Sequence, residues 1–509
     1  MKTESPQMPA IRYTHGRMEA TVRPEIEWNA LLPLMSLIAT ATLVLLVEMF
    51  LPRGRHAPLI VIGLIGLALA GYFQISLWQT SLTTFENLWR VDTISSLLTL
   101  AILGATALTL LFSEEYLQQR DLRYGEFYPL LLFASAGAVI MVSSTNLMVV
   151  FLGLEVLSLA LYVLAGLARY EVRSEESALK YFLLGAFASA FFLYGIAMLY
   201  GATGSVDLMA IARGWGNSAP GTATSAMLIA SVALLLVGLA FKASLVPFHM
   251  WTPDVYQGAP TIATAYMSAV VKVAVFGVLI RFVEGAAGMA GLWAPILWWL
   301  AALSMVVGNL LALVQRDAKR MLAYSSIAHA GYMAVGLVSL NATGLSGILY
   351  YLVAYSLMSV GAFAVLTVMA RAGDATTIEA LRGLYYRQPF AAHAMAVLLV
   401  SLAGIPPTAG FWGKWYLFVA SLEAGQVLLA ILLALTSVVG AAYYLGLVFA
   451  LYTPPRETVE RWRMPAPMAA CLLACVLGLI LLGLAPSWLT APARQAVEAS
   501  ATRVSSGLP

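Results

Sequence analysis

Four lysines and one glutamate stand inside long apolar runs of the sequence, where charged side chains are rare. They are Lys180, Lys242, Lys272, Lys414 and Glu155. An ionised group in hydrocarbon costs several kcal/mol even after its surroundings relax, so such residues must reach water or do chemistry. Arginine stays protonated in proteins, whereas a buried lysine can release and recapture a proton. Because every base that we place inside an apolar run is a lysine, the pattern predicts proton transfer.

The depth of these residues separates a functional interpretation from a structural one. Lys272 lies about eleven residues from either end of its run, roughly 16 Å deep at 1.5 Å per residue. A lysine stem spans only about 6 Å, so it cannot bring this ammonium to the headgroups. Glu155 has a similar depth and a shorter side chain. Lys180 is about one turn inside its run, and for it a stem that reaches the headgroups is an alternative to a role in proton transfer.

The composition identifies the elements that hold these residues. The chain has 509 residues, of which 61% are hydrophobic and 10% are charged, as in a polytopic membrane protein. About fourteen runs are long enough to cross a bilayer, and we expect all of them to be helices because a helix satisfies its own backbone in lipid. The runs are 30–51, 58–78, 93–112, 127–143, 146–167, 177–200, 224–258, 261–284, 291–314, 320–340, 343–371, 390–420, 425–452 and 465–486. The fold class is therefore all-α, and residues 1–29 form a polar N-terminal tail.

Basic residues in the connections predict the orientation. Most of them fall in the odd-numbered connections, such as Arg123 and Arg316, whereas the even-numbered ones hold Arg90, Arg213 and Arg281. By the positive-inside rule the odd connections face the cytoplasm and both termini lie on the opposite side. After this assignment no basic patch is left that would favour nucleic-acid binding.

Two of the runs are too long and too rich in proline to be single helices. Residues 240–261 read AFKASLVPFHMWTPDVYQGAPT, within a run of about 35 residues that would measure roughly 52 Å as a straight helix. Pro247 removes a backbone donor, so we expect a break at 245–253, with Lys242 in the last turn before it. The twelfth run repeats the pattern in SLAGIPPTAGFWGKWYLF, with Lys414 just beyond Pro407. Broken helices that carry a charged residue are typical of ion pathways in transporters, although ordinary proline kinks are an alternative.

The two breaks lie five spans apart, which suggests an internal repeat. If spans four to eight and nine to thirteen are copies of one unit, the odd number of spans makes the second copy inverted relative to the first. We therefore divide the chain into the tail, 30–126 with helices one to three, 127–284 and 285–452 as the two repeats, and 453–509 with the last span and a C-terminal tail.

The sequence offers little for other chemistries. Cys471 and Cys475 lie one turn apart on the last span, too few for a zinc or iron–sulfur site, and are expected to be packing residues. His329 stands in the middle of its span in KRMLAYSSIAHAGY, beside two serines and a tyrosine. A hydrogen-bonded structural histidine and a proton relay are equally compatible with that surrounding.

Five segments together resemble a known family. They are FLGLEVLSLALYVLAG, ESALKYFLLGAFASAFFLYG, KRMLAYSSIAHAGY and the two broken runs. They resemble the antiporter-like membrane subunits of respiratory complex I, the proton-translocating NADH:quinone oxidoreductase, over spans four to thirteen. Lysine at position 414, where the M type has glutamate, favours the N type, also called the subunit-2 type.

The resemblance implies a role for each site residue. Glu155 would be the acid of the fifth span, paired with Lys242 of the broken seventh. Lys272 would be the bridging lysine of the eighth span, Lys414 the terminal lysine of the broken twelfth, and Lys180 the lysine of the sixth. A Glu155–Lys242 pair at about 4 Å, with an effective dielectric near 20, would be worth roughly 4 kcal/mol, enough to load and unload the lysine as the pair separates.

The position of each lysine relative to its break gives a further expectation. Lys242 precedes Pro247 at the C-terminal end of a half-helix, where the helix dipole favours a cation. Lys414 follows Pro407, near the N-terminal end of the next half-helix, where the dipole would oppose one. We therefore expect Lys242 to be the resting proton reservoir and Lys414 the easier donor.

The resemblance also implies the setting. It places the chain in a bacterial inner membrane rather than an organellar one, beside M-type, K-type and L-type subunits, the last with its lateral helix. It implies no cofactor in this chain, with NAD, FMN, iron–sulfur clusters and quinone bound by partner subunits. Two alternatives remain: a subunit of an Mrp-type cation/proton antiporter, and a membrane scaffold that conducts no ions.

Overall fold

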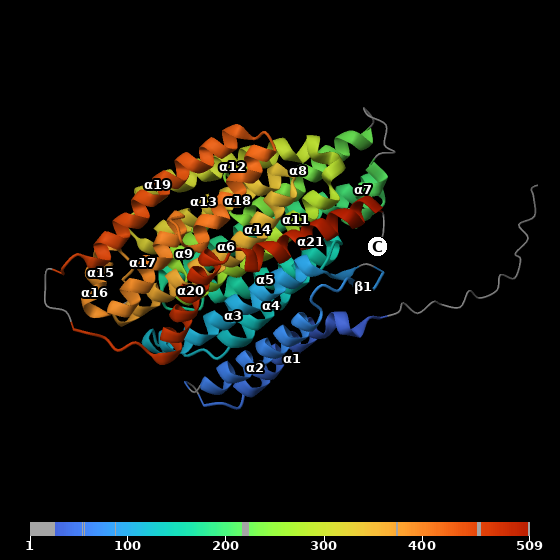
Figure 1. The fold of residues 1–509 in the computed structure, drawn as a ribbon. Helices are drawn as coiled ribbons and strands as arrows, with labels where there is room; N and C mark the ends of the chain where they lie inside the picture. The colour runs from blue at the N-terminus through green and yellow to red at the C-terminus, as the bar shows by residue number, and fades with distance from the viewer. Residues whose placement is uncertain are drawn as a thin grey trace, which may run out of the picture.

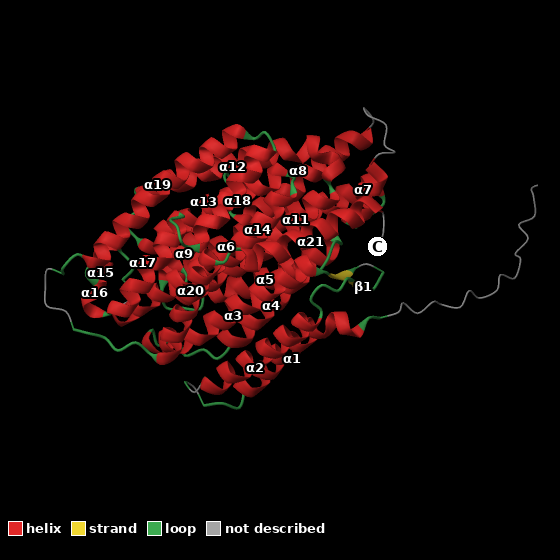
Figure 2. Ribbon diagram, in the orientation of Figure 1, coloured by secondary structure: helices red, strands yellow, loops and turns green. Residues whose placement is uncertain are grey.

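Helices make up nearly the whole chain in the computed structural model, which describes residues 26–506 apart from 53, 55, 87, 216–222, 373–374 and 456–459 (Figure 2). The tail predicted for 1–29 lies largely outside the described residues, and α1 begins at Trp28. Because apolar side chains cover almost every turn, the helices can meet lipid or one another on all sides. The all-α membrane fold predicted from the sequence is confirmed.

Within the described residues, 12 helices are long and apolar enough to cross a membrane. They are α1 (Trp28–Glu48), α2 (Ala57–Ser76), α3 (Thr93–Gln119), α5 (Leu147–Ala165), α6 (Val172–Thr203), α8 (Ala223–Ala243), the continuous Thr261–Gly285, α12 (Ala290–Leu313), α13 (Ala318–Ser339), α14 (Ala342–Thr367), α19 (Val427–Tyr452) and α20 (Ala466–Leu484). Two shorter apolar helices are α4 (Phe127–Val142) and α17 (Pro389–Ala403). The count of fourteen spans, the domain bounds and the inverted repeat stay predictions.

The seventh run is broken as expected. The helix α8 ends at Ala243, and a separate helix, α9 (Trp251–Gly258), follows after the turn that contains Pro247. Ser244 adopts a φ of 61°, and the N–H groups of Ser244 and Leu245 bond to carbonyls three and five residues earlier in the last turn of α8. This pattern is a Schellman turn, which ends a helix by satisfying carbonyls that no further turn can reach.

The twelfth run ends its first half in the same way. The helix α17 stops at Ala403, and α18 (Ala409–Glu423) begins after the two prolines. Gly404 has a φ of 84°, and the N–H groups of Gly404 and Ile405 again bond to carbonyls three and five residues earlier. The two breaks therefore share one backbone turn, a likeness between the halves that the side chains alone do not reveal.

The helices that carry Lys272 and His329 lie at the centre of the bundle, together with α14. The segments Thr261–Gly285, α13 and α14 are almost completely enclosed by other helices. In Figure 1, α1 and α2 lie along one edge of the bundle and α19 lies along the opposite edge. The helix α14 packs against α3, α10 (Thr261–Tyr266), α13, α17 and α18, so it contacts both halves of the second broken segment and the helix α10 that follows the first.

Several elements were not anticipated. A hairpin of β1 (Leu82–Thr84) and β2 (Trp89–Val91) joins α2 to α3. The C-terminal segment expected to be a tail is a helix, α21 (Ser487–Ser506), which packs along α14. The remaining elements are α7 (Leu208–Trp215), the π-helical turn η1 (Met267–Val271), α11 (Lys272–Gly285), η2 (Ala287–Met289), η3 (Val368–Ala372), α15 (Ile378–Leu381) and α16 (Leu384–Arg387).

Candidate functional site

The ammonium group of Lys242 is enclosed by aromatic rings. Lys242 lies in the last turn of α8, as predicted, and its side chain is buried. Its Nζ is 4.7 Å from the centre of the Tyr181 ring and 5.1 Å from that of Tyr162, and it is 3.4 Å from the Tyr181 hydroxyl oxygen. Trp251 stacks on Tyr181, with the ring centres 4.5 Å apart. Ring faces stabilise a cation without holding a proton themselves, so this surrounding can store a charge on Lys242.

Glu155 approaches the same region from α5. Its Oε1 atom is buried and has no hydrogen-bond partner among the described residues, and the same holds for the hydroxyl of Tyr162, two turns later on the same face of α5. Glu155 and Lys242 interact electrostatically, but no ion pair within 4.0 Å joins them in the described part of the chain. The two side chains are therefore near each other without an ion pair shorter than 4.0 Å, and their pairing stays a prediction.

Lys272 comes from a helix that faces the first break. It is 1% exposed, and its Nζ donates a hydrogen bond to the carbonyl oxygen of Ala243, the last residue of α8. The π-helical turn η1 directly precedes Lys272 and contains Ser268. Such a turn inserts one extra residue and re-aims the side chains that follow, and these turns occur often at functional sites. The ammonium thus caps the end of a half-helix that belongs to another span.

Lys414 holds the corresponding place at the second break. Its Nζ donates to the carbonyl oxygen of Ala403, the last residue of α17, at 3.0 Å, and it lies 4.9 Å from the centre of the Tyr332 ring. The expectation that the helix dipole opposes this cation is wrong. The backbone of Lys414 belongs to α18, but its side chain folds back past Gly404 to the negative end of α17.

His329 lies near the lysines of both capped breaks. It is buried in α13, with Nδ1 2.6 Å from the Tyr351 hydroxyl and Nε2 3.0 Å from the Tyr444 hydroxyl. It interacts electrostatically with both Lys272 and Lys414. Both ring nitrogens therefore have hydroxyl partners, an arrangement that serves a structural histidine and a proton relay alike.

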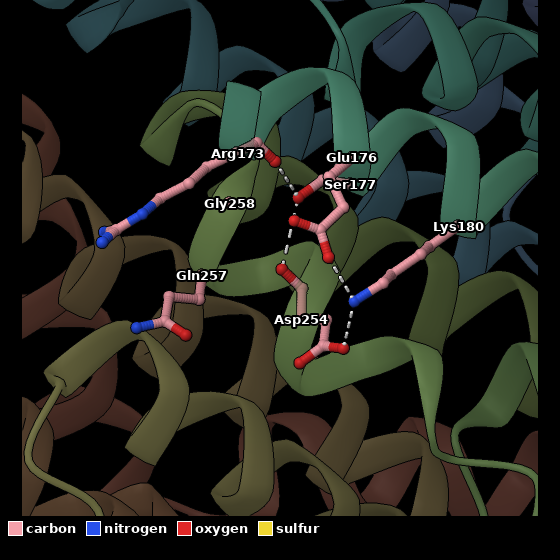
Figure 3. Close-up of a pocket in the computed structure, with 7 residues that line it drawn as sticks. All are labelled: Arg173, Glu176, Ser177, Lys180, Asp254, Gln257 and Gly258. Atoms are coloured by element: carbon pink, nitrogen blue, oxygen red, sulfur yellow. Dashed lines mark hydrogen bonds and ion pairs between the residues drawn. The ribbon is translucent and has the colours of Figure 1, made fainter. Parts of the chain in front are cut away.

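Lys180 is placed differently from the other lysines. Its side chain is 41% exposed, and its ammonium lies 2.6 Å from Glu176 and 2.8 Å from Asp254. These charged side chains line a polar cavity of about 230 Å³ (Figure 3). The Ser177 hydroxyl beside them donates a hydrogen bond to the backbone carbonyl oxygen of Asp254. The structure does not bring Lys180 into contact with Lys242, so it forms a separate ionic group at the end of α6.

Arg281, which we placed in a connection, is in fact buried within a helix. Arg281 is 2% exposed in α11 and forms ion pairs with Asp92 at 2.5 Å and with Glu284 at 3.6 Å, while Arg90 lies 3.2 Å from Asp92. Asp92 also caps α3. Burial raises the pKa of Asp92, but the charge and hydrogen bond of Arg281 outweigh it and bring the pKa down to about 2. The statement that every base inside the apolar runs is a lysine is therefore wrong.

The sequence analysis missed Asp254 and the tyrosines. Asp254 follows Trp251 and a proline in α9, and the sequence analysis gave it no role as a partner of Lys180. The sequence analysis gave no role to the tyrosines whose hydroxyls contact Lys242 and His329. No group of three or more His, Cys, Asp or Glu within the described ranges is arranged to hold a metal ion.

Comparison with known proteins identifies relatives over most of the chain. The family model described as NADH:quinone oxidoreductase/Mrp antiporter, transmembrane, matches residues 144–440. The chain is 42% identical over 476 residues to NADH-quinone oxidoreductase subunit N of Trichlorobacter lovleyi, covering 93% of this chain and 97% of that protein. A chain of respiratory complex I from Thermus thermophilus matches with a TM-score of 0.76 and 40% identity, over 90% of this chain and 98% of that one.

A different assembly shares the fold. A chain of the Mrp complex from Dietzia sp. matches with a TM-score of 0.80 over 95% of this chain and all of that one, but at 21% identity. Since the two TM-scores are nearly equal, backbone shape does not separate the two kinds of assembly. The sequence identity separates them, since it is 40% to the complex I chain and 21% to the Mrp chain.

Proposed function

This chain belongs to the NADH:quinone oxidoreductase/Mrp antiporter family, among the N-type subunits of complex I, and from that premise we propose that its buried lysines carry protons across the membrane. It is a multi-pass membrane subunit of NADH:quinone oxidoreductase in the bacterial inner membrane, with the other membrane subunits of the complex as its partners. The observation that carries the proposal is the shared placement of Lys272 and Lys414, each bonded to the last carbonyl of a broken helix, with His329 near both.

In the proposed path Lys242 holds the first proton. The rings of Tyr162 and Tyr181 stabilise its ammonium form, and a charged Glu155 nearby adds to that stabilisation. A change at Glu155 imposed by a neighbouring subunit alters that balance, and the proton leaves toward Lys272. From Lys272 it passes His329 and its hydroxyl partners to Lys414 at the second break. Bridging waters complete the steps that exceed hydrogen-bond distance.

The energy for these steps comes from outside the chain in this proposal. NAD, FMN, the iron–sulfur clusters and quinone bind to partner subunits, and quinone reduction there drives the change at Glu155. The M-type subunit, the K-type subunit and the lateral helix of the L-type subunit are the neighbours that would transmit it. This chain then contributes proton translocation to the enzyme and has no catalytic site of its own.

The test compares proton pumping with electron transfer in the assembled complex. Lys242→Met and Glu155→Gln should each strongly reduce the protons taken up per NADH oxidised in inverted membrane vesicles, because each removes one member of the charge pair at the start of the path. Glu126→Gln is a suitable control, since Glu126 is an exposed carboxylate at the start of α4 that makes no capping hydrogen bond. Normal pumping in both variants, with normal assembly, would contradict the proposal.

A second candidate is a cation/proton antiporter of the Mrp kind, which the shared fold favours. Its lysines and broken helices would serve the exchange of sodium for protons. Purified complex in sealed vesicles distinguishes the two. NADH-driven proton uptake that is the same with sodium and with choline supports the first function, and sodium-dependent exchange without NADH supports the second. A scaffold role would leave both activities unchanged when Lys242 is replaced.

A further inference from the structure

One carboxylate beside the first break binds basic residues on two different helices. Asp254 lies on α9, the short helix that follows the break, and its two oxygens bind different partners. Oδ2 is 2.8 Å from Nζ of Lys180 on α6, and Oδ1 is 2.7 Å from Nη1 of Arg320 on α13. Arg320 also donates to the side chain of Gln257 on α9 at 3.1 Å. Any movement of α9 therefore changes both the ion pair with α6 and the ion pair with α13.

The first residue of α9, in the same turn as Asp254, touches the surroundings of Lys242. This residue, Trp251, stacks on the Tyr181 ring with an angle of 9° between the planes. Its indole N–H donates to the carbonyl oxygen of Phe241, next to Lys242 in α8, at 2.9 Å. Tyr181 is the ring that contacts the Lys242 ammonium. A cation attracts these ring faces and a neutral amine does not, so loss of the proton changes the contact on which α9 rests.

The helix α9 also binds the first turn of α13 through an ion pair and a hydrogen bond. Arg320 is in the first turn of α13, where the helix dipole disfavours a cation, so its position depends on the Asp254 carboxylate. The neighbouring Lys319 donates to the carbonyl oxygen of Ala259 at the C-terminal end of α9, at 2.7 Å. His329 follows Arg320 by nine residues on the same helix, about 14 Å along the axis. The helix α9 thus contacts the Lys242 region and the helix that carries His329.

We propose that Asp254 is a positioning residue that couples the charge state of Lys242 to the placement of α13, and through it to His329. The inference rests on the proposed proton path. When Lys242 loses its proton, the Tyr181–Trp251 stack is released and α9, only eight residues long, shifts as one piece. The distances from Asp254 to Lys180 and to Arg320 then change, and α13 moves with Arg320. Coupling of this kind requires contacts that differ between the two states, and the Asp254 ion pairs supply them.

Glu176 provides a matched control for this role. Asp254→Asn keeps the size of the side chain and removes the charge that binds both Lys180 and Arg320. Glu176→Gln removes only the other carboxylate of Lys180, which lies 2.6 Å from its ammonium. We expect Asp254→Asn to lower the protons taken up per NADH oxidised, with assembly retained, and Glu176→Gln to match the wild type. Wild-type pumping in Asp254→Asn, or an equal loss in both variants, would overturn the inference.

Arg320 gives a second approach that does not depend on the folding of the Asp254 variant. Arg320→Gln cuts only the link to α13 and should also lower the ratio, whereas Arg320→Lys, which keeps the charge, should restore much of it. The double variant should lose no more than Asp254→Asn alone, because that replacement already cuts the link to Arg320. An unchanged ratio in Arg320→Gln contradicts the coupling. Normal pumping in these variants while Lys242→Met fails to pump rejects this inference alone, whereas normal pumping in Lys242→Met rejects the proposed function itself.

Discussion

Gly404 is the residue on which the geometry of the second break depends most directly. Its φ of 84° lies in the left-handed region, where a residue with a Cβ loses about 1–2 kcal/mol. A Cβ added there would also lie 2.9 Å from Cδ of Lys414. Since ordinary carbon contacts begin near 3.5 Å, the lysine stem would have to move by roughly 0.5 Å. The bond from Lys414 to the Ala403 carbonyl, now 3.0 Å, would lengthen toward the limit at which hydrogen bonds fade.

Gly404→Ala should therefore lower both the stability and the proton pumping of the assembled complex. Gly425 is the matched control, because it has a φ of 71° and nothing within 4 Å of an added Cβ. Gly425→Ala should show the same loss of stability, about 1–2 kcal/mol, with normal pumping. Thermal denaturation of the purified complex measures the first effect, and proton uptake per NADH oxidised in inverted vesicles measures the second. An equal pumping ratio in the two variants would refute the reasoning, since the contact with Lys414 would then have no consequence.

Two other replacements test the remaining charged groups. Lys180→Ala should reduce pumping less than Lys242→Met, because Lys180 is partly exposed and its loss leaves the bond between Asp254 and Arg320 intact; an equal loss would place Lys180 in the path itself. Asp92→Asn should destabilise the complex by about 2 kcal/mol at neutral pH, since the pKa of Asp92 lies near 2 instead of 3.8 and each unit is worth 1.36 kcal/mol. A lowered pKa stabilises the fold above its ordinary value and loses that effect as the carboxylate is protonated, so the difference in melting temperature should be constant above about pH 5 and shrink between about pH 4 and 2. A difference that does not change with pH would contradict a role of the Asp92 charge, since asparagine keeps the oxygen that caps α3.

The broken helices could be predicted because their causes are local in the sequence. Pro247 and the pair Pro406–Pro407 remove backbone donors, and Gly404 permits the left-handed turn, so the breaks follow from a few adjacent residues. The depth of Lys272 could likewise be read from its distance to the ends of an apolar run. The first prediction needed only the residues at each break, and the second needed only the length of a helix and the reach of a side chain.

The partners of these residues could not be predicted, because they come from distant parts of the chain. Lys272 bonds to Ala243, 29 residues earlier on another helix, and Arg281 pairs with Asp92, 189 residues away. Arg281 was assigned to a connection because arginine ends an apolar run, and only the packing of α3 against α11 reveals its buried acid. The direction of the Lys414 side chain was missed for a similar reason. Its place in the sequence gave the helix to which it belongs, but not the helix end that it reaches.

The carbonyl groups that bind Lys272 and Lys414 differ in kind from a carboxylate. A glutamate beside a lysine can take the proton that the lysine gives up, so the charge of the pair depends on which member holds it. A backbone carbonyl at a helix end is a permanent dipole that does not titrate. At the ends of α8 and α17 each lysine therefore faces a fixed negative potential, and a proton that leaves it must travel onward because its immediate partner cannot accept it. In this chain the main-chain turn, rather than a second acid, acts as the constant counter-charge of the path.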